Sequence, residues 1–351
     1  MSEFRQNPLT GQWVVIAPAR ADRPQPQREA LPSAAPLDDC PFCPGRERET
    51  PPEAFAVRLD GSPPDTPGWS VRVIPNKFPA TRMDAKEPPT PESIAFAPKG
   101  AAPAGPPASG ATLCIGTPAT GQHEVIVLSP DHRRGLAELD DRQVRLLLEA
   151  LRHRYRIVMQ SRDVQYACIF QNRGREAGAT IDHPHLQLLA TSVVPAAAET
   201  MLVRQSSFAL ANGRTLCAAL LDEELASGRR IISEHDDFVV LAPWASAAPY
   251  ETWILPRTRI RDVGCLSDDA VTSLARVVRD SLRRVRLQLG DPPYNLVFHS
   301  APKGRAGDEH GQLLVQIIPR IGGFGGVELA CGLFINPVQP EAAASLLRFN
   351  V

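Results

Sequence analysis

Residues 178–187 read Gly-Ala-Thr-Ile-Asp-His-Pro-His-Leu-Gln, a stretch with one histidine on either side of a proline. In an extended segment alternate side chains share a face, so His183, His185 and Gln187 are expected to point the same way. A neutral imidazole is a good nucleophile toward phosphorus, which makes His185 the candidate nucleophile. Gln187 is suited to orient a phosphoryl oxygen without adding negative charge, and His183 is free for another role, such as metal binding. A bare His-x-His pair also occurs at metal sites or by chance, so the flanking residues matter.

A short apolar strand, residues 166–170, runs into a polar loop that ends at these histidines. Gly174 and Gly178 suit a loop whose backbone approaches a phosphate closely. Either Arg173 or Arg175 is expected to supply positive charge there. Such loops occur in many proteins, and this one indicates a phosphate site only together with the histidines.

Cys40-Pro-Phe-Cys43 is a second candidate site, a CxxC pair followed by a Pro-Gly turn. Two thiolates at this spacing form half of a tetrahedral zinc site, and the other half needs two more cysteines or histidines. His132 and His183 are the candidates for that half. The alternatives are a structural disulfide and a redox dithiol, which favours a thioredoxin-like context that is not recognisable here.

Five motifs occur in the same order as in the galactose-1-phosphate uridylyltransferases, and the sequence resembles that family from Arg5 to about Asn336. The motifs are Asn7-Pro-Leu-Thr-Gly-Gln-Trp13, Ala17-Pro-Ala-Arg20-Ala-Asp-Arg23-Pro24, Cys40-Pro-Phe-Cys43, Ser129-Pro-Asp-His132 and His183-Pro-His185-Leu-Gln187. The family belongs to the histidine-triad superfamily, which also contains the ADP-glucose phosphorylases. Because the motifs are ordered and span nearly the whole chain, the resemblance is specific.

The resemblance implies an enzyme that moves a nucleoside monophosphate in two displacements. His185 is expected to attack the α-phosphorus of a nucleotide sugar, which gives a nucleotidyl-histidine and releases a sugar 1-phosphate. A hexose 1-phosphate or inorganic phosphate then accepts the nucleotidyl group, with ping-pong kinetics. UDP-glucose and galactose 1-phosphate are the first expectation. The alternatives are an ADP-glucose phosphorylase, a hydrolase of nucleotide conjugates and, least favoured, a zinc-containing nucleotide-binding protein without catalysis.

The resemblance also implies roles for individual residues. The expected catalytic residues are His185 and Gln187. The expected ligands of a structural Zn²⁺ ion, the one expected cofactor, are Cys40, Cys43, His132 and His183. The expected substrate-binding residues are Arg20, Arg23, Asn76, Asn172, Thr180, Glu328 and Asn336. Three further histidines are interpreted from their positions in the sequence, and not from the resemblance, as ordinary surface or helix-end residues: His123, His153 and His235.

Internal similarity predicts two copies of one strand, helix, strand, strand unit. The similar pairs are strands 124–128 and 251–255, helices at about 140–160 and 268–289, and strands 166–172 and 294–300. The helices are recognised by their apolar periodicity. The expected fold is α+β, with two histidine-triad-like subdomains that each consist of an antiparallel sheet with packed helices. These subdomains are residues 1–195 and 196–351, joined between about Val194 and Ser207.

The second copy lacks the histidine pair, because Gln312 and Leu314 stand where His183 and His185 stand in the first copy. Some members of the resembled family place a second metal on this unit. Of the positions that match the ligands of this second metal, only His299 has a side chain that binds metals well, so iron is not expected. The other positions read Met201, Gln312 and Leu314.

Charge and composition narrow the expected partners. The 351 residues include 38 basic and 39 acidic side chains, a net charge of -1, so nucleic acid and membranes are not expected as partners. The resemblance implies a nucleotide sugar and a sugar 1-phosphate as partners. The first ten residues contain no apolar signal core, and seven cysteines with one close pair do not resemble a secreted framework. A cytoplasmic location is expected, and the resemblance suggests a homodimer. Residues 88–121, dominated by Pro, Ala, Gly, Ser and Thr, are expected to form a mobile loop without chemistry.

Overall fold

The computed structural model describes residues 2–22, 39–84 and 116–348 of the chain. Arg23 and residues 88–115 of the expected proline-rich loop lie outside the described residues. Among the helices of the described residues, none is both long and apolar enough to cross a membrane.

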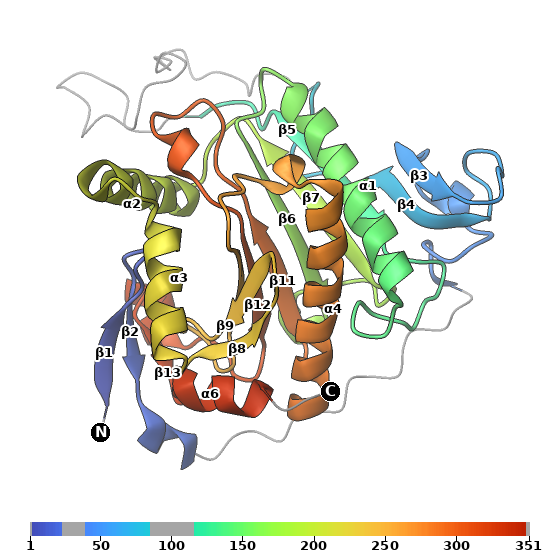
Figure 1. The fold of residues 1–351 in the computed structure, drawn as a ribbon. Coiled ribbons are helices and arrows are strands. Elements are labelled where there is room, and N and C mark those ends of the chain that lie inside the picture. Colours follow the sequence, from blue (N-terminus) through green and yellow to red (C-terminus); the bar gives the residue numbers. More distant parts are fainter. Residues whose placement is uncertain (1, 23–38, 85–115, 349–351) are drawn as a thin grey trace.

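Two units with the same order of elements form the centre of the molecule (Figure 1). Each consists of three strands, one long helix and two further strands, which confirms the α+β class. The elements of the first unit are β3 (Phe55–Arg58), β4 (Trp69–Pro75), β5 (Gly121–Val127), α1 (Asp141–Gln160), β6 (Tyr166–Arg173) and β7 (His185–Thr191). Those of the second unit are β8 (Ile231–Glu234), β9 (Phe238–Leu241), β10 (Thr252–Pro256), α4 (Asp268–Leu289), β11 (Tyr294–His299) and β12 (Leu314–Pro319).

The two units share one antiparallel sheet. Its strand order is β3-β4-β5-β7-β6-β11-β12-β10-β9-β8, so the five strands of each unit are neighbours. The units meet where β6 pairs with β11, with Phe170 opposite Val297 and Asn172 opposite Asn295. The sequence predicts one sheet for each unit. Pairing of β6 with β11 joins them, because an unpaired strand at the edge of either sheet would leave its backbone groups without partners.

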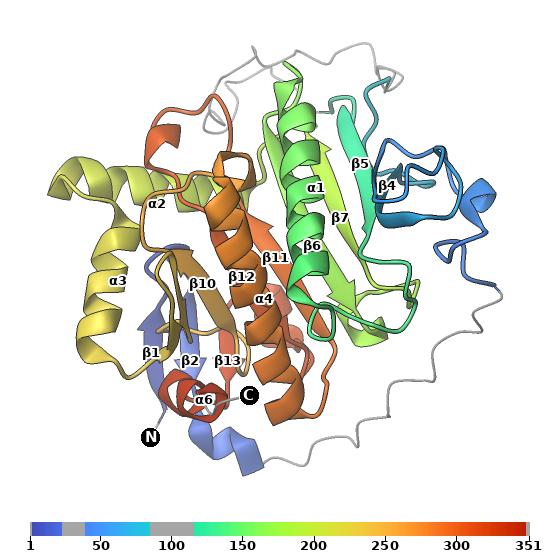
Figure 2. The same ribbon diagram turned by 45° about the vertical axis from the view of Figure 1, so that its right-hand side comes forward.

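Helices α1 and α4 lie side by side on one face of this sheet (Figure 2). Each begins after a residue whose side chain accepts a backbone N–H of the first turn, Asp140 for α1 and Ser267 for α4. Apolar residues then recur every three or four positions and pack on the strands. Those of α1 include Val144, Leu147, Leu148 and Leu151. Each such leucine contributes about 1.5 to 3 kcal/mol on burial, so this layer is the main core of the described residues.

The opposite side of the sheet, here called the outer face, carries the residues of the strands that alternate with the core residues. On β7 the core positions are Leu186 and Leu188, and the outer face therefore has His185 and Gln187. The expectation that these two side chains point the same way is confirmed.

Strand pairing shifts the alignment of the two copies by one residue. The equivalent pairs are Val125 with Gln187 in the first unit and Trp253 with Gln316 in the second. His123 is therefore equivalent to Glu251, whereas sequence similarity matches residue 124 with residue 251. A shift of the same size affects β6 and β11, because Phe170 pairs with Gln187 and Val297 with Gln316. Apolar runs match almost equally well in neighbouring registers, and only the pairing decides which face each residue occupies.

A three-stranded sheet packs beside the second unit. Its strands are β1 (Glu3–Gln6), β2 (Trp13–Ile16) and β13 (Phe334–Asn336), with β2 parallel to β13. Arg5 donates to Glu341 at 3.0 Å and lies 3.8 Å above the ring of Trp244. The first strands of the chain thus pack with its last third, and a boundary at residue 195 does not separate the two structural units completely. That boundary stays a prediction.

Helix α2 (Ala196–Asn212) and helix α3 (Leu216–Ser227) connect the two units. The expected junction between Val194 and Ser207 begins just before α2 and covers most of this helix. Leu216 and Leu221 of α3 pack on the outer face of the second unit together with Leu9. The remaining helical elements are α5 (Gly326–Cys331), α6 (Pro340–Leu347) and the short 3-10 turns η1 (Pro18–Asp22), η3 (Glu47–Glu49), η4 (Arg175–Ala177), η5 (Val263–Cys265) and η6 (Asp308–His310).

Candidate active site and metal cluster

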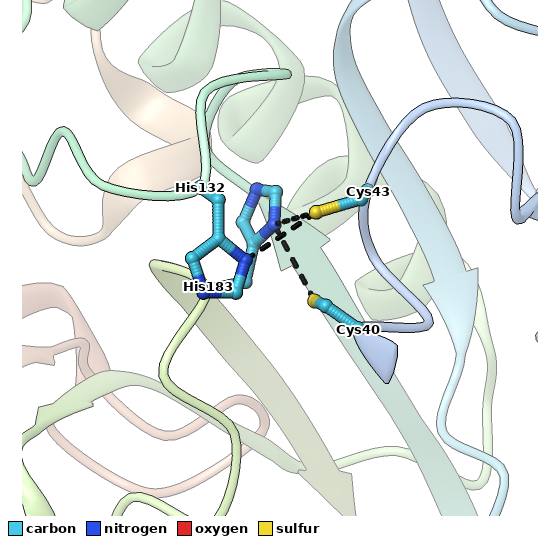
Figure 3. A group of neighbouring side chains, drawn as sticks. All are labelled: Cys40, Cys43, His132 and His183. Atoms are coloured by element: carbon cyan, nitrogen blue, oxygen red, sulfur yellow. Dashed lines mark hydrogen bonds between the residues drawn. The ribbon is translucent and has the colours of Figure 1, made fainter. Parts of the chain in front are cut away.

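Four side chains of metal-ligating types, those of Cys40, Cys43, His132 and His183, meet between the CxxC loop and the segment that enters β7 (Figure 3). Their ligand atoms all lie within 4.8 Å of one another. The Sγ atom of Cys43 is 3.3 Å from Nδ1 of His132 and 3.6 Å from Nδ1 of His183. The Sγ atom of Cys40 is 3.7 Å from the same nitrogen of His183. The structure therefore brings together all four residues that the sequence predicts as ligands.

These separations fit a tetrahedral zinc ion. Zinc–sulfur bonds of about 2.3 Å and zinc–nitrogen bonds of about 2.0 to 2.1 Å place neighbouring ligand atoms about 3.6 Å apart. Nε2 of His183 donates to the carbonyl oxygen of Ser129 at 2.9 Å, which leaves Nδ1 unprotonated and directed at the thiols. For the protein groups alone, burial raises the pKa of Cys43 to about 11 and lowers that of His183 to about 4. A bound dication favours the thiolates and the neutral imidazoles that such a site requires.

The metal cluster lies directly beside His185. The ring of Phe42, inside the CxxC loop, packs edge-on against the imidazole of His185 with 5.3 Å between ring centroids. Nδ1 of His185 donates to the carbonyl oxygen of His183 at 2.8 Å, so the lone pair is on Nε2. The side chain is 8% exposed, and burial lowers its pKa. A neutral imidazole with one free nitrogen has the form that nucleophilic attack on phosphorus requires.

Gln187 contacts a histidine that the sequence interpretation sets aside. Nε2 of His123, on β5, lies 2.9 Å from Oε1 of Gln187. Nδ1 of His123 accepts the backbone N–H of Ala80 at 3.2 Å. Asn76, directly after β4, places Nδ2 3.3 Å from Nε2 of the same ring. The interpretation of His123 as an ordinary surface histidine is wrong, since Nε2 of its ring contacts two predicted site residues, Gln187 and Asn76.

Asn172 lies on β6, on the same outer face. Two residues earlier, Phe170 pairs with Gln187, which places Phe170, Asn172 and Gln187 on one side of the sheet. Oδ1 of Asn172 accepts Nδ2 of Asn295 at 2.8 Å, and the same nitrogen donates to the carbonyl oxygen of Ala177 at 2.8 Å. Asn295 belongs to the second unit and is not among the residues that the sequence predicts.

The loop between β6 and β7 has the glycine conformations that a close approach of backbone to ligand favours. Gly174 and Gly178 have φ angles of 83° and 92°, in the region that other residues avoid. Thr180 is exposed in this loop. Arg173, one of the two arginines expected to supply charge, instead forms a two-pronged ion pair with Asp291 of the second unit, at 2.8 Å for both contacts.

Three predicted substrate-binding residues lie on other elements. Arg20 is exposed in η1, next to the three-stranded sheet. The carboxylate of Glu328 accepts a backbone N–H at the start of α5 at 2.8 Å. Asn336 is 1% exposed, and its Nδ2 donates to the carbonyl oxygens of Ser246 and Ala248 at 3.0 and 3.1 Å. Asn336 holds a backbone turn of the second unit, which does not support its predicted role as a substrate contact.

The donor set of the second unit does not suit an iron ion. Nε2 of His299 is 2.7 Å from Oε1 of Gln316 and is engaged by it. The positions that match the other ligands of the resembled family hold the thioether of Met201, the carboxamide of Gln312 and the alkyl chain of Leu314. One imidazole among these groups is not an iron site.

Comparison with known proteins agrees with these features. The sequence profile of the galactose-1-phosphate uridyl transferase N-terminal domain matches residues 1–195. An ADP-glucose phosphorylase of Arabidopsis thaliana is 32% identical over 352 residues, which cover 99% of this chain and 92% of that protein. A galactose-1-phosphate uridylyltransferase of Haemophilus influenzae is 29% identical over 322 residues, which cover 90% and 83%.

A solved structure is similar over the whole length. The crystal structure of an ADP-glucose phosphorylase from Arabidopsis thaliana with bound ADP-glucose has a TM-score of 0.80 at 30% identity, and the match covers 100% of this chain and 99% of that chain. Because the profile spans more than half of the 351 residues and the similarity extends over the rest, the chain belongs to the galactose-1-phosphate uridyl transferase family.

Proposed function

We propose that the protein is a nucleotidyltransferase that works through a nucleotidyl-histidine at His185. In the first displacement Nε2 of His185 attacks the α-phosphorus of a nucleotide sugar. The nitrogen–phosphorus bond forms while the bond from that phosphorus to the bridging oxygen breaks, and the sugar 1-phosphate leaves with the oxygen. In the second displacement a phosphate oxygen of the acceptor attacks the same phosphorus, and the imidazole is released.

The orientation of His185 is the observation that carries this proposal. The hydrogen bond from Nδ1 to the carbonyl oxygen of His183, at 2.8 Å, fixes the ring and its tautomer. It leaves Nε2 as the attacking atom and stabilises the positive charge that the ring acquires when the bond to phosphorus forms.

Three carboxamides on or beside the outer face support phosphate binding. Each has its oxygen engaged by a donor of the protein, which turns the amino group to the other side of the carboxamide; that of Asn172 lies 3.5 Å from the carbonyl oxygen of Gly178. These carboxamides belong to Asn76, Gln187 and Asn172. Neutral N–H donors stabilise the charge on phosphate oxygens in the transition state, and they need no counter-charge in the free enzyme.

We assign the metal cluster to a structural Zn²⁺ ion held by Cys40, Cys43, His132 and His183. When bound, the ion supplies a cross-link between the CxxC loop and the segment before β7. Protein residues position the nucleophile: the CxxC loop holds Phe42 against His185, and the carbonyl oxygen of His183 accepts the hydrogen bond from Nδ1 of His185.

UDP-glucose as donor and galactose 1-phosphate as acceptor are the first candidates, supported by membership of the family and by the uridylyltransferase of Haemophilus influenzae. The second candidate is phosphorolysis of ADP-glucose by inorganic phosphate. It is supported by the phosphorylase of Arabidopsis thaliana, which is 32% identical over 99% of the chain, and by the similar structure with bound ADP-glucose. The two candidates share the first displacement and differ in base and acceptor.

The proposal extends to the remaining contacts and to the context of the enzyme. Residues 1–195 are proposed to carry the nucleophile and the zinc site, and residues 196–351 to contribute acceptor contacts, with Glu328 on a pair of sugar hydroxyls. Basic contacts to the nucleotide are proposed for Arg20 and Arg23, and a phosphate contact for Thr180. A homodimer in the cytoplasm, without nucleic acid or membrane partners, completes the proposal.

Initial-rate kinetics with both substrate pairs test the proposal. Parallel double-reciprocal lines are expected for one pair, since the sugar 1-phosphate leaves before the acceptor binds. The pair with the higher kcat/KM identifies the base and the acceptor. Intersecting lines for both pairs would contradict the double displacement, and release of free nucleoside monophosphate without any acceptor would indicate a hydrolase.

A further inference from the structure

His123 connects three segments around the predicted phosphate site. Its Nε2 lies 2.9 Å from Oε1 of Gln187, and its Nδ1 accepts the backbone N–H of Ala80 at 3.2 Å. Its carbonyl oxygen accepts the backbone N–H of Asn76 at 2.8 Å. The ring and the backbone of His123 are therefore held from both sides, and the ring is placed against the glutamine that follows the nucleophile.

The polarity of these hydrogen bonds determines which end of Gln187 faces a ligand. The N–H of Ala80 can only donate, so Nδ1 of His123 accepts and the proton of the neutral ring is on Nε2. That N–H donates to Gln187, where only Oε1 is able to accept. The amino group of Gln187 is left on the outer face, close to His185. The amino group of Asn76, 3.3 Å from Nε2, finds no acceptor there and is left for a ligand as well.

The second unit has the reverse arrangement at the equivalent position. Glu251 stands where His123 stands, and its Oε1 accepts Nε2 of Gln316 at 2.7 Å. Nε2 of His299 donates to Oε1 of the same carboxamide at 2.7 Å. Both ends of Gln316 are thus engaged by the protein, whereas Gln187 keeps its amino group for a ligand. Two positions thus differ between the units, Glu251 in place of His123 and His299 in place of Asn172, and together they turn the carboxamide of Gln316 the opposite way.

We infer that His123 is a positioning residue for nucleotidyl transfer, which orients the carboxamide of Gln187 so that its N–H groups face the phosphate attacked by His185. The inference rests on the proposed function. Without the donor on His123, the carboxamide also adopts the opposite orientation, in which its oxygen faces the anionic phosphate and destabilises the transition state. Loss of a supporting partner of this kind typically lowers activity about 10- to 100-fold.

Three substitutions at this position test the inference by rapid-quench measurement of adduct formation. His123→Ala removes the donor and is expected to slow the first displacement about 10- to 100-fold, with little change in KM for the nucleotide sugar. His123→Gln keeps an N–H donor within reach and is expected to recover most of the rate. His123→Glu replaces the donor by an acceptor, as Glu251 does at the equivalent position, favours the opposite orientation of the carboxamide and is expected to be at least as slow as His123→Ala. His153→Ala, on the exposed side of α1, is the matched control and leaves the rate unchanged.

A double-mutant cycle separates orientation of the carboxamide from general damage to the fold. In the Gln187→Met enzyme, His123→Ala is expected to have no further effect on the rate, since the group that it orients is gone. Additive losses, or a His123→Gln enzyme as slow as His123→Ala, would overturn the inference. If the wild-type enzyme itself forms no adduct, the proposed function fails and the inference fails with it. If the wild type forms the adduct and His123→Ala forms it equally fast, only the inference fails.

Discussion

The two five-stranded units share one architecture, but only the first carries the predicted chemistry. On the face that α1 and α4 cover, both units place buried apolar residues of their central strands, such as Leu186 and Leu188 in the first and Val315 and Ile317 in the second. On the outer face the first unit has His185, where the second has Leu314 in an apolar cluster. The covered face is enough to specify the sheet and its helices, so the outer face is free to hold a site in one unit and a packed surface in the other.

The units also differ in how their outer faces are covered. In the first unit the CxxC loop packs on Val125 and Val127. In the second unit α3 packs on Trp253 and Leu255, which are the equivalent residues. The first unit thus has a loop with candidate metal ligands where the second has an apolar helix, and the zinc ion proposed above would cross-link that loop.

The largest expected effect on turnover is at His185, where the second unit has a leucine instead of the predicted nucleophile. His185→Ala removes the nucleophile, and turnover is expected to fall by about four orders of magnitude or more while nucleotide binding persists. Steady-state rates and isothermal titration with the donor check both parts. His153→Ala is the control and keeps full activity. Residual turnover within about 10-fold of the wild type would show that His185 is not the nucleophile.

Removing one predicted metal ligand is expected to loosen the CxxC loop, which packs on the outer face of the first unit. Cys40→Ser is expected to lose the metal and to lower Tm by roughly 5 °C or more, since a structural zinc ion contributes directly to the free energy of folding. Activity should fall with it, because Phe42 no longer packs on His185. Elemental analysis and thermal unfolding, with and without a chelator, measure both effects. Cys331→Ser, at an exposed cysteine of α5, is the control, and equal Tm values for the two variants would contradict the role of the cluster.

A smaller effect on activity is expected from Asn295, a residue of the second unit whose side chain contacts the predicted site in the first. Asn295→Ala removes the donor that holds Oδ1 of Asn172 and the carbonyl oxygen of Ala177. A net contribution of about 1 kcal/mol for such a bond corresponds to roughly 5-fold in kcat/KM. The exposed Asn212→Ala, at the end of α2, is the control. No difference between the two variants would mean that the second unit does not orient the site through Asn295.

The smallest effect is expected at the ion pair between the two units. Arg173 and Asp291 are 21% and 37% exposed, so water and salt screen their interaction. Arg173→Met is expected to lower the free energy of unfolding by less than about 1 kcal/mol, and by less still in high salt. Urea unfolding at two salt concentrations measures this. A decrease of more than about 3 kcal/mol would show that this pair, rather than the β6–β11 pairing, holds the units together.

The metal cluster and the nucleophile are predictable from the sequence because chemistry fixes their residue types. Thiolates and imidazoles that bind zinc have few substitutes, so Cys40, Cys43, His132 and His183 can be recognised although they come from three separate segments. The structure brings these four ligand atoms together, and places His185 beside them.

The role of His123 was not predictable in the same way. Its contact to Gln187 depends on the pairing of β5 with β7, and the sequence separates the two residues by 64 positions. One signal exists, because a strand that begins at Gly121 places His123 on the same face as Val125 and Val127. Only the register decides that this face is the one that carries Gln187. Apolar patterns of period two leave that choice open.

The other differences between prediction and structure have the same cause, because they also depend on strand pairing and register. The repeat is visible from its helices and strands, but its alignment is shifted by one residue at β5 and at β6. Pairing of β2 with β13 joins segments more than 300 residues apart, and no local pattern indicates it. Asn336 is expected from the resemblance to bind substrate, yet its side chain holds the backbone at Ser246 and Ala248.

The most direct test of the account is mass spectrometry of the intact, metal-loaded protein after incubation with UDP-glucose or ADP-glucose and no acceptor. The account predicts an added nucleoside monophosphate with one of the two donors. Fragmentation should place it on His185, and galactose 1-phosphate or inorganic phosphate should remove it. An adduct on another residue, or none with either donor from a folded, metal-loaded sample, would contradict the account.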